Sequence, residues 1–143
     1  MKIHHIICAA FASTALSSPV DAREPQHPAN GPGEEVNLLF SRAVPNIPGK
    51  SLIALEVHYP PGGTSQAHRH AKSAFIYGYV VSGRVRTQVA GEPVHVYSAG
   101  ESFHEDPGSH HLAGGNASTT EPAKLLAVFV VDTDDKQLTT PDQ

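Results

Sequence analysis

Short apolar segments, separated by turns rich in glycine and proline, run through most of the chain. The segments span 36–42, 52–59, 75–81, 84–90, 94–97, 101–105 and 124–131, and the turns between them include 60–63, 82–83, 91–93 and 107–108. Segments of this length bounded by such residues are typical of β-strands. After residue 22 no stretch has helical periodicity, so no crossover helix is expected. The pattern therefore predicts an all-β sandwich or barrel.

Residues 1–22 have a different pattern, that of a secretory signal peptide. Lys2 precedes an apolar stretch at 6–16, and the small-residue sequence ending at Ala22 resembles a cleavage site. The stretch is too short for a membrane span, which needs about 20 residues. The single cysteine, Cys8, lies too early in the apolar stretch for a lipid-attachment site. We therefore expect a secreted or periplasmic protein, cleaved near Ala22, with no thiol in the mature chain.

The remaining chain predicts one domain between two polar ends. Residues 23–35 contain three prolines and two glycines and are expected to form a flexible N-terminal arm. The barrel domain is assigned to 36–131, and 132–143 form a polar C-terminal tail. The whole sequence is 39% hydrophobic and 17% charged with a net charge of −4, and it has no basic run. This composition favours a globular protein without a nucleic-acid partner or a membrane span in the mature chain.

Two histidines one residue apart, His68 and His70, are the first candidate for chemistry. Residues at i and i+2 of a strand project from the same face, about 6.5 Å apart between Cα atoms, so both imidazoles can reach one metal ion. Arg69 between them would then point away. His27 in the arm and His95 on a strand are expected to face solvent.

These histidines belong to a longer pattern that resembles the cupin superfamily. The first cupin motif is matched by Gly62, His68, His70 and Gly83, and the second by Gly100, Pro107-Gly108, His111 and Asn116. The resemblance covers residues 62–116. It implies a double-stranded β-helix, the jelly-roll barrel of cupins.

The resemblance also implies a metal site made by His68, His70 and His111. A strand turns only one of the neighbours His110 and His111 inward, and the cupin spacing selects His111. Imidazole ligands without thiolates or clustered carboxylates suit one divalent ion, and the expected choices are Fe, Mn, Ni or Zn.

One departure from the family affects the predicted chemistry. Cupins commonly carry a glutamate after the second histidine, whereas residues 71–82 contain no carboxylate. Three neutral imidazoles would leave a divalent ion with about two positive charges, which favours an anionic ligand. His104 or Glu105, whichever faces inward, could supply the missing carboxylate or the catalytic acid or base. Gln66 could orient a bound water or substrate.

Aromatic side chains are expected to line the mouth of the barrel. The candidates are Phe75, Tyr77, Tyr79, Phe103 and Phe129, with alternate strand positions facing in and out. Tyr77 and Phe103, together with Gln66, are the predicted substrate-binding residues. His58, on the strand before the first motif, is a further candidate for the interior.

Three functions fit these residues. The first is an exported, metal-dependent cupin enzyme of dioxygenase, isomerase or lyase type, acting on a small organic substrate that could be anionic, with His104 or Glu105 moving a proton. The second is a non-catalytic cupin that binds or senses a small ligand. The third is a barrel with a vestigial, empty site. The resemblance is also compatible with a homodimer.

Overall fold

The computed structural model describes residues 33–143, which form an all-β fold. Over this range the chain has no helix, and therefore none long and apolar enough to cross a membrane. The strands are β1 (Glu35–Ala43), β2 (Lys50–Tyr59), β3 (Thr64–Ser65), β4 (His68–His70), β5 (Phe75–Ser82), β6 (Arg84–Val89), β7 (His95–Ser98), β8 (Ser102–Glu105), β9 (His110–Asn116), β10 (Ala123–Asp132) and β11 (Thr139–Pro141). The predicted fold class is confirmed. The expected signal peptide, Cys8 and His27 lie outside the described residues and stay predictions.

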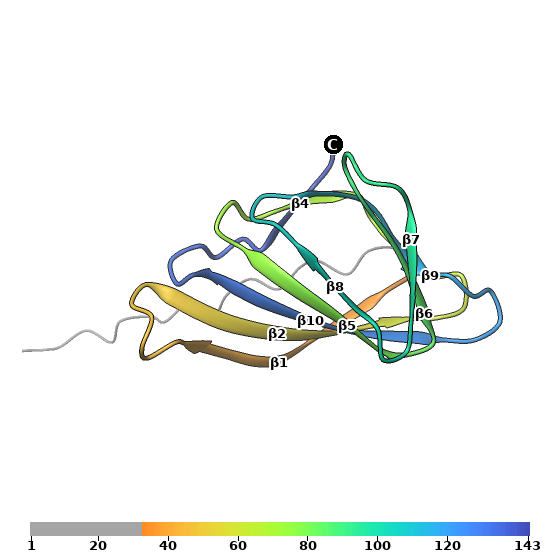
Figure 1. Ribbon diagram of the computed structural model, residues 1–143, viewed down its shortest axis with the longest axis horizontal. Helices are drawn as coiled ribbons and strands as arrows, with labels where there is room; N and C mark the ends of the chain where they lie inside the picture. Colours follow the sequence, from red (N-terminus) through yellow and green to blue (C-terminus); the bar gives the residue numbers. More distant parts are fainter. Residues whose placement is uncertain (1–32) are drawn as a thin grey trace, which may run out of the picture.

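One wall of the barrel is a five-stranded antiparallel sheet in the order β1-β2-β10-β5-β8 (Figure 1). Its two longest strands, β2 and β10, bury every second residue. Leu55 lies opposite Ala127, and Ile53 lies opposite Phe129. The segment 52–59 is therefore a strand, as predicted, with one face in the core. In 124–131 the continuous apolar run leaves every second side chain half-buried on the outer face.

The other wall is a sheet in the order β11-β4-β9-β6-β7, with β3 also paired to β9. In Figure 1 these strands lie across the barrel from β2 and β10. The apolar core fills the space between the two walls in two clusters. One cluster includes Leu55 and Phe129, and the other includes Val80 and Val85. The inner face of β4 and β9 is thereby left for polar side chains.

The motif residues other than histidine shape the loops around this core. Gly62, Gly100 and Gly108 have φ angles of 72°, 92° and 74°, a region that favours glycine. The side-chain amide of Asn116 donates to the carbonyls of Pro60, at 3.1 Å, and Glu121, at 2.7 Å. Asn116 is 5% exposed. It therefore fixes two loops at the end of β9.

The segment 132–143, described above as a polar tail, contributes an edge strand to the barrel. In this segment β11 pairs with β4, with Thr139 opposite His70. Leu138, the residue before β11, is 1% exposed and packs in the core cluster of Leu55. The strands β3, β4, β9 and β11 were absent from the predicted apolar segments because their sequences are polar or glycine-rich.

The packing of Leu138 gives a test of the C-terminal strand. Leu138→Ala should lower the free energy of unfolding by about 2–5 kcal/mol, because it removes buried methyl groups and leaves a cavity. Leu39→Ala is the matched control, since Leu39 is 56% exposed, and should change stability by less than about 0.5 kcal/mol. Urea denaturation followed by circular dichroism measures both values. Equal effects of the two substitutions would show that 132–143 does not pack on the barrel.

Candidate metal centre

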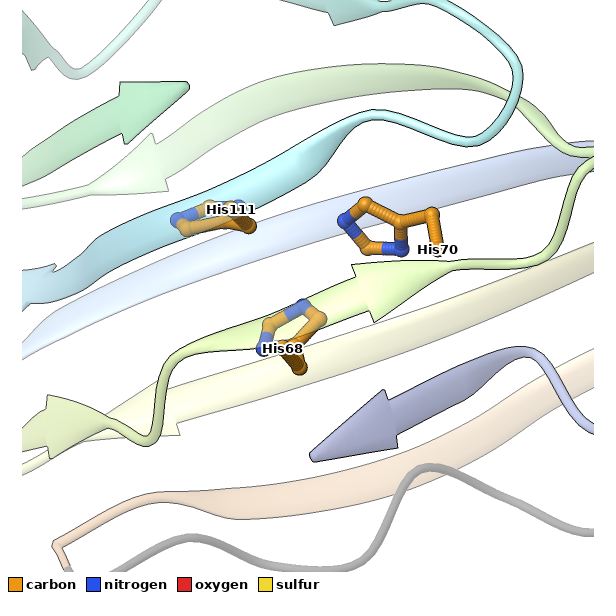
Figure 2. Close-up of side chains that lie close together, drawn as sticks. All are labelled: His68, His70 and His111. Carbon is orange, nitrogen blue, oxygen red and sulfur yellow. The ribbon is translucent and has the colours of Figure 1, made fainter. Parts of the chain in front are cut away.

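Three histidines from two neighbouring strands converge inside the barrel. His68 and His70 lie on β4 and His111 lies on β9, and the β4–β9 register places His68 directly opposite His111. Figure 2 shows the three imidazoles gathered between these strands. One nitrogen from each ring lies within 4.8 Å of the nitrogens from the other two. The two sequence motifs therefore meet at one point.

His68 is held in the neutral, coordinating form. Its Nδ1 lies 2.7 Å from the main-chain carbonyl of Gln66 and donates to it, because a carbonyl only accepts. The lone pair then lies on Nε2. Burial lowers the pKa of His68 to about 4. At neutral pH the ring is therefore uncharged and can bind a cation.

His70 is the most deeply buried of the three histidines. It is 8% exposed, and within the described residues neither of its ring nitrogens has a hydrogen-bond partner. Its Nε2 lies 3.1 Å from Oε2 of Glu105, an ion-pair distance without hydrogen-bond geometry. Unpartnered buried polar atoms are costly. A metal ion bound by His70 would relieve this cost.

Glu105, at the end of β8, supplies a buried carboxylate beside the histidines. It is 4% exposed. Its Oε1 accepts a hydrogen bond from Nδ1 of His111 at 3.0 Å, and its Oε2 accepts one from the hydroxyl of Ser109, also at 3.0 Å. Burial opposes ionisation of Glu105, but its contacts with His111 and His70 outweigh this effect and hold its pKa well below the usual range. Glu105 is therefore an anion within the site.

The other edge of the His111 ring is packed against β6 and against its own strand. Nε2 of His111 lies 3.2 Å from the hydroxyl of Thr87, a buried residue of β6. A Cβ atom added to Gly114 would lie 2.8 Å from the same Nε2 and 3.3 Å from the hydroxyl oxygen of Ser65. The glycine thus leaves open the space between His111 and Ser65.

The histidines face a small cavity of about 70 Å³. A cavity of this size has room for a small ligand. The apolar part of the wall includes Leu55, Val57, Ile76, Phe103, Leu125 and Phe129. A second polar group, made of Glu34, Tyr59 and Ser65, also lines the cavity. The cavity therefore has a largely apolar wall, with the histidine cluster and the group of Glu34, Tyr59 and Ser65 as its two polar regions.

The structure decides which of His104 and Glu105 faces inward. Glu105 does, whereas His104 is exposed and stacks on Phe75 with ring centroids 5.9 Å apart. His104 is thus outside the cavity, and its predicted catalytic role is not supported by its position.

Of the five aromatic candidates, Phe103 and Phe129 line the cavity. Phe75 and Tyr77, 42% and 43% exposed, lie on the outer face of β5 with Tyr79. Tyr77, one of the predicted substrate-binding residues, therefore lies outside the cavity. The inward positions of β5 are Ile76, Gly78 and Val80.

Two other polar candidates, Gln66 and His58, also lie outside the cavity. Gln66 is exposed because β3 ends at Ser65 and β4 begins at His68, which interrupts the strand alternation. Ser65 lines the cavity in its place. His58 points outward and forms an ion pair with Glu56 at 2.5 Å.

His110, the alternative to His111, points away from the histidine cluster. Its Nε2 lies 2.7 Å from a carboxylate oxygen of Asp142. As predicted, His95 is exposed.

Sequence reasoning did not identify Glu34, Tyr59 or Ser65. Of these three residues, only Ser65 carried a signal in the sequence, because it is a small hydroxyl residue shortly before the histidine pair.

The donor set fits a divalent metal ion. Two nitrogens bound to one ion at about 2.1 Å are at most about 4.2 Å apart, so a separation of 4.8 Å needs only a small movement of the rings. The neutral His68 and the unpartnered His70 both suit this role. His68, His70 and His111 could therefore hold the ion, with Glu105 next to it.

Comparisons with solved structures agree with this architecture. An oxalate oxidase in complex with glycolate is 26% identical with a TM-score of 0.54, and the match covers 71% of this chain and 52% of that one. A double-stranded β-helix protein from Klebsiella pneumoniae is 18% identical with a TM-score of 0.60, covering 83% and 92% of the two chains. An oxalate decarboxylase mutant from Bacillus subtilis is 20% identical with a TM-score of 0.59, covering 81% and 30%.

The chain thus spans about half the length of the oxalate oxidase and less than a third of the decarboxylase. Among curated proteins, none matches the sequence. The sequence matches the Cupin domain over residues 55–129, just over half of the chain. With its double-stranded β-helix and the two motifs meeting inside it, this protein belongs to the cupin family.

Proposed function

We propose that this cupin holds a divalent metal ion through His68, His70 and His111 and acts as an enzyme on a small organic substrate in the adjoining cavity. The observation that carries the proposal is the convergence of three imidazoles on that cavity, one of them buried without a hydrogen-bond partner in the described part of the chain. A bound ion would polarise an oxygen atom of the substrate. Fe, Mn, Ni and Zn all suit such imidazole ligands.

Glu105 would position the ligands and balance charge. Its hydrogen bond with Nδ1 of His111 fixes the orientation of that ring, as carboxylates commonly do for metal-binding histidines. Ser109 in turn fixes the carboxylate. The anion also reduces the excess positive charge of the site from about two to about one. The preference for anionic ligands expected without a carboxylate is correspondingly weaker.

The cavity restricts the size of the substrate but does not determine the type of reaction. Its volume of about 70 Å³ admits a small molecule, and its wall is largely apolar. The oxalate oxidase and oxalate decarboxylase among the structural neighbours support chemistry on small, oxygen-rich compounds. Dioxygenase, isomerase and lyase reactions all fit such a site, because the fold itself does not select the chemistry.

One observation favours a non-catalytic alternative, a cupin that binds or senses a small ligand. Both carboxylate oxygens of Glu105 already accept hydrogen bonds, from His111 and Ser109. A carboxylate held in this way is poorly placed to exchange protons with a substrate. If the protein is an enzyme, the proton must move through another group or through the ligand itself.

Removal of single histidines tests the metal site. His70→Ala and His111→Ala should each abolish stoichiometric metal binding, because two imidazoles leave the ion with too few protein ligands. His104→Ala is the matched control, since this histidine is exposed outside the cavity, and should retain one ion per chain. Elemental analysis after loading with Fe, Mn, Ni or Zn and removal of free metal gives the stoichiometry. Failure of the unmodified protein to bind any of these ions would reject the proposal.

Removal of the charge on Glu105 tests its positioning role. Glu105→Gln should weaken metal affinity by about 10- to 100-fold, because the side chain no longer supplies a carboxylate to His111. Glu92→Gln removes the same charge from an exposed position and should leave affinity unchanged. Competition with a chelating dye measures affinity, and thermal unfolding of the metal-free proteins separates it from loss of fold. Unchanged affinity in a folded Glu105→Gln variant would refute this role.

A further inference from the structure

A buried threonine takes a core position beside the histidine cluster. Strand β6 buries Val85 and Thr87, which are 1% and 6% exposed. Valine has the same shape as threonine and would bury no polar atom at position 87, whereas a buried hydroxyl group is costly unless it is hydrogen-bonded. Within the described residues, the one hydrogen-bond partner of this hydroxyl is Nε2 of His111, at 3.2 Å. Thr87 therefore depends on a residue of the proposed metal site.

The tautomer of His111 decides which of the two groups donates. Nδ1 of His111 lies 3.0 Å from Oε1 of Glu105, and a carboxylate only accepts, so Nδ1 carries the ring proton. In the neutral ring that a metal ion requires, Nε2 then has the lone pair. Thr87 must donate its proton to this lone pair. Both nitrogens of His111 are thus used before an ion binds.

A metal ion and the Thr87 hydroxyl would compete for the same lone pair. Because Glu105 holds the proton on Nδ1, an ion can bind His111 only through Nε2. An imidazole nitrogen cannot bind an ion and accept a hydrogen bond with one lone pair. The hydroxyl would lose its partner when the ion binds, and an unpaired buried hydroxyl is costly. No hydroxyl group of the described residues bonds to a ring nitrogen of His68 or His70.

We propose that Thr87 sets the metal affinity of the site: its hydroxyl stabilises the ion-free form of His111, which makes binding of the ion weaker and more readily reversible. This inference rests on the proposed metal site. Thr87 does not line the cavity, so it would act through His111 and not on the ligand. Its effect is opposite to that of Glu105, which orients the same ring for the ion from the other edge.

Replacement of the hydroxyl by a methyl group tests this role. Thr87→Val should raise the affinity for zinc by about 3- to 10-fold, the range expected for one hydrogen bond. Thr87→Ser, which keeps the hydroxyl, should retain the original affinity. Thr119→Val makes the same change at an exposed position and should have no effect. Competition with a chelating dye at pH 8, above the usual titration range of histidine, measures affinity, and circular dichroism shows whether each variant is folded.

A gain in affinity is a useful readout because damage to the packing around His111 would weaken metal binding instead. Nitrogen NMR tests the same hydrogen bond without zinc. The spectrum should show the proton of His111 on Nδ1, and Thr87→Val should move the Nε2 resonance toward that of a nitrogen without a hydrogen bond. A proton on Nε2 in the unmodified protein would overturn the inference, because Thr87 could not donate to it.

The two proposals fail in different ways. If the unmodified protein binds zinc but Thr87→Val leaves the affinity unchanged or lowers it, the role of Thr87 is refuted and the metal site stands. An equal gain in Thr87→Ser would also refute it, because that variant retains the hydroxyl. If the unmodified protein binds none of Fe, Mn, Ni or Zn, both proposals fail.

Discussion

The site depends on the pairing of two short strands, β4 and β9, in one register. His68 lies directly opposite His111 in this pairing, and His70 follows on the same face. Side chains alternate across a strand, so a slip of one residue would turn His111 outward and His110 inward. The register is held on both sides of β4. The amide of His70 donates to the carbonyl of Ser109, and the amide of Asp142 beyond β11 donates to that of Ala67, both at 3.0 Å.

This arrangement places costly groups in the interior. His70 and Glu105 are nearly inaccessible, and burial opposes the negative charge on Glu105. The hydrogen bonds from His111 and Ser109 offset this cost for Glu105, whereas His70 has no such partner among the described residues. The unpartnered His70 thus lowers the free energy of unfolding, and a cation bound to it would raise that free energy again. A structural histidine would be expected to have its own hydrogen-bond partner instead.

The sequence predicted the sheet and the histidine cluster well, because strand alternation and the two cupin motifs are strong local signals. Other features depended on packing that local patterns do not encode. Tyr77 was assigned to the interior as an aromatic residue, but Gly78 faces inward. A Cβ atom at Gly78 would lie 2.5 Å from the ring of Phe103. The phenylalanine therefore fills the space that an inward aromatic of β5 would need. The role of β11 was missed because Leu138 is a single apolar residue in a polar segment.

The parts of the cavity with the weakest sequence signals are those that distinguish its ligands. Glu34 precedes β1 and Thr139 begins β11, so both ends of the described chain contribute to the cavity wall. Glu105 brings one negative charge next to the neutral imidazoles, so a divalent ion bound there would keep an excess of about one positive charge, which a single carboxylate of a ligand would balance. Net charge then gives a second anionic group on a ligand no advantage. Hydrogen bonding and size then decide what binds, and both are set by the loops and edge strands around the barrel rather than by the histidines.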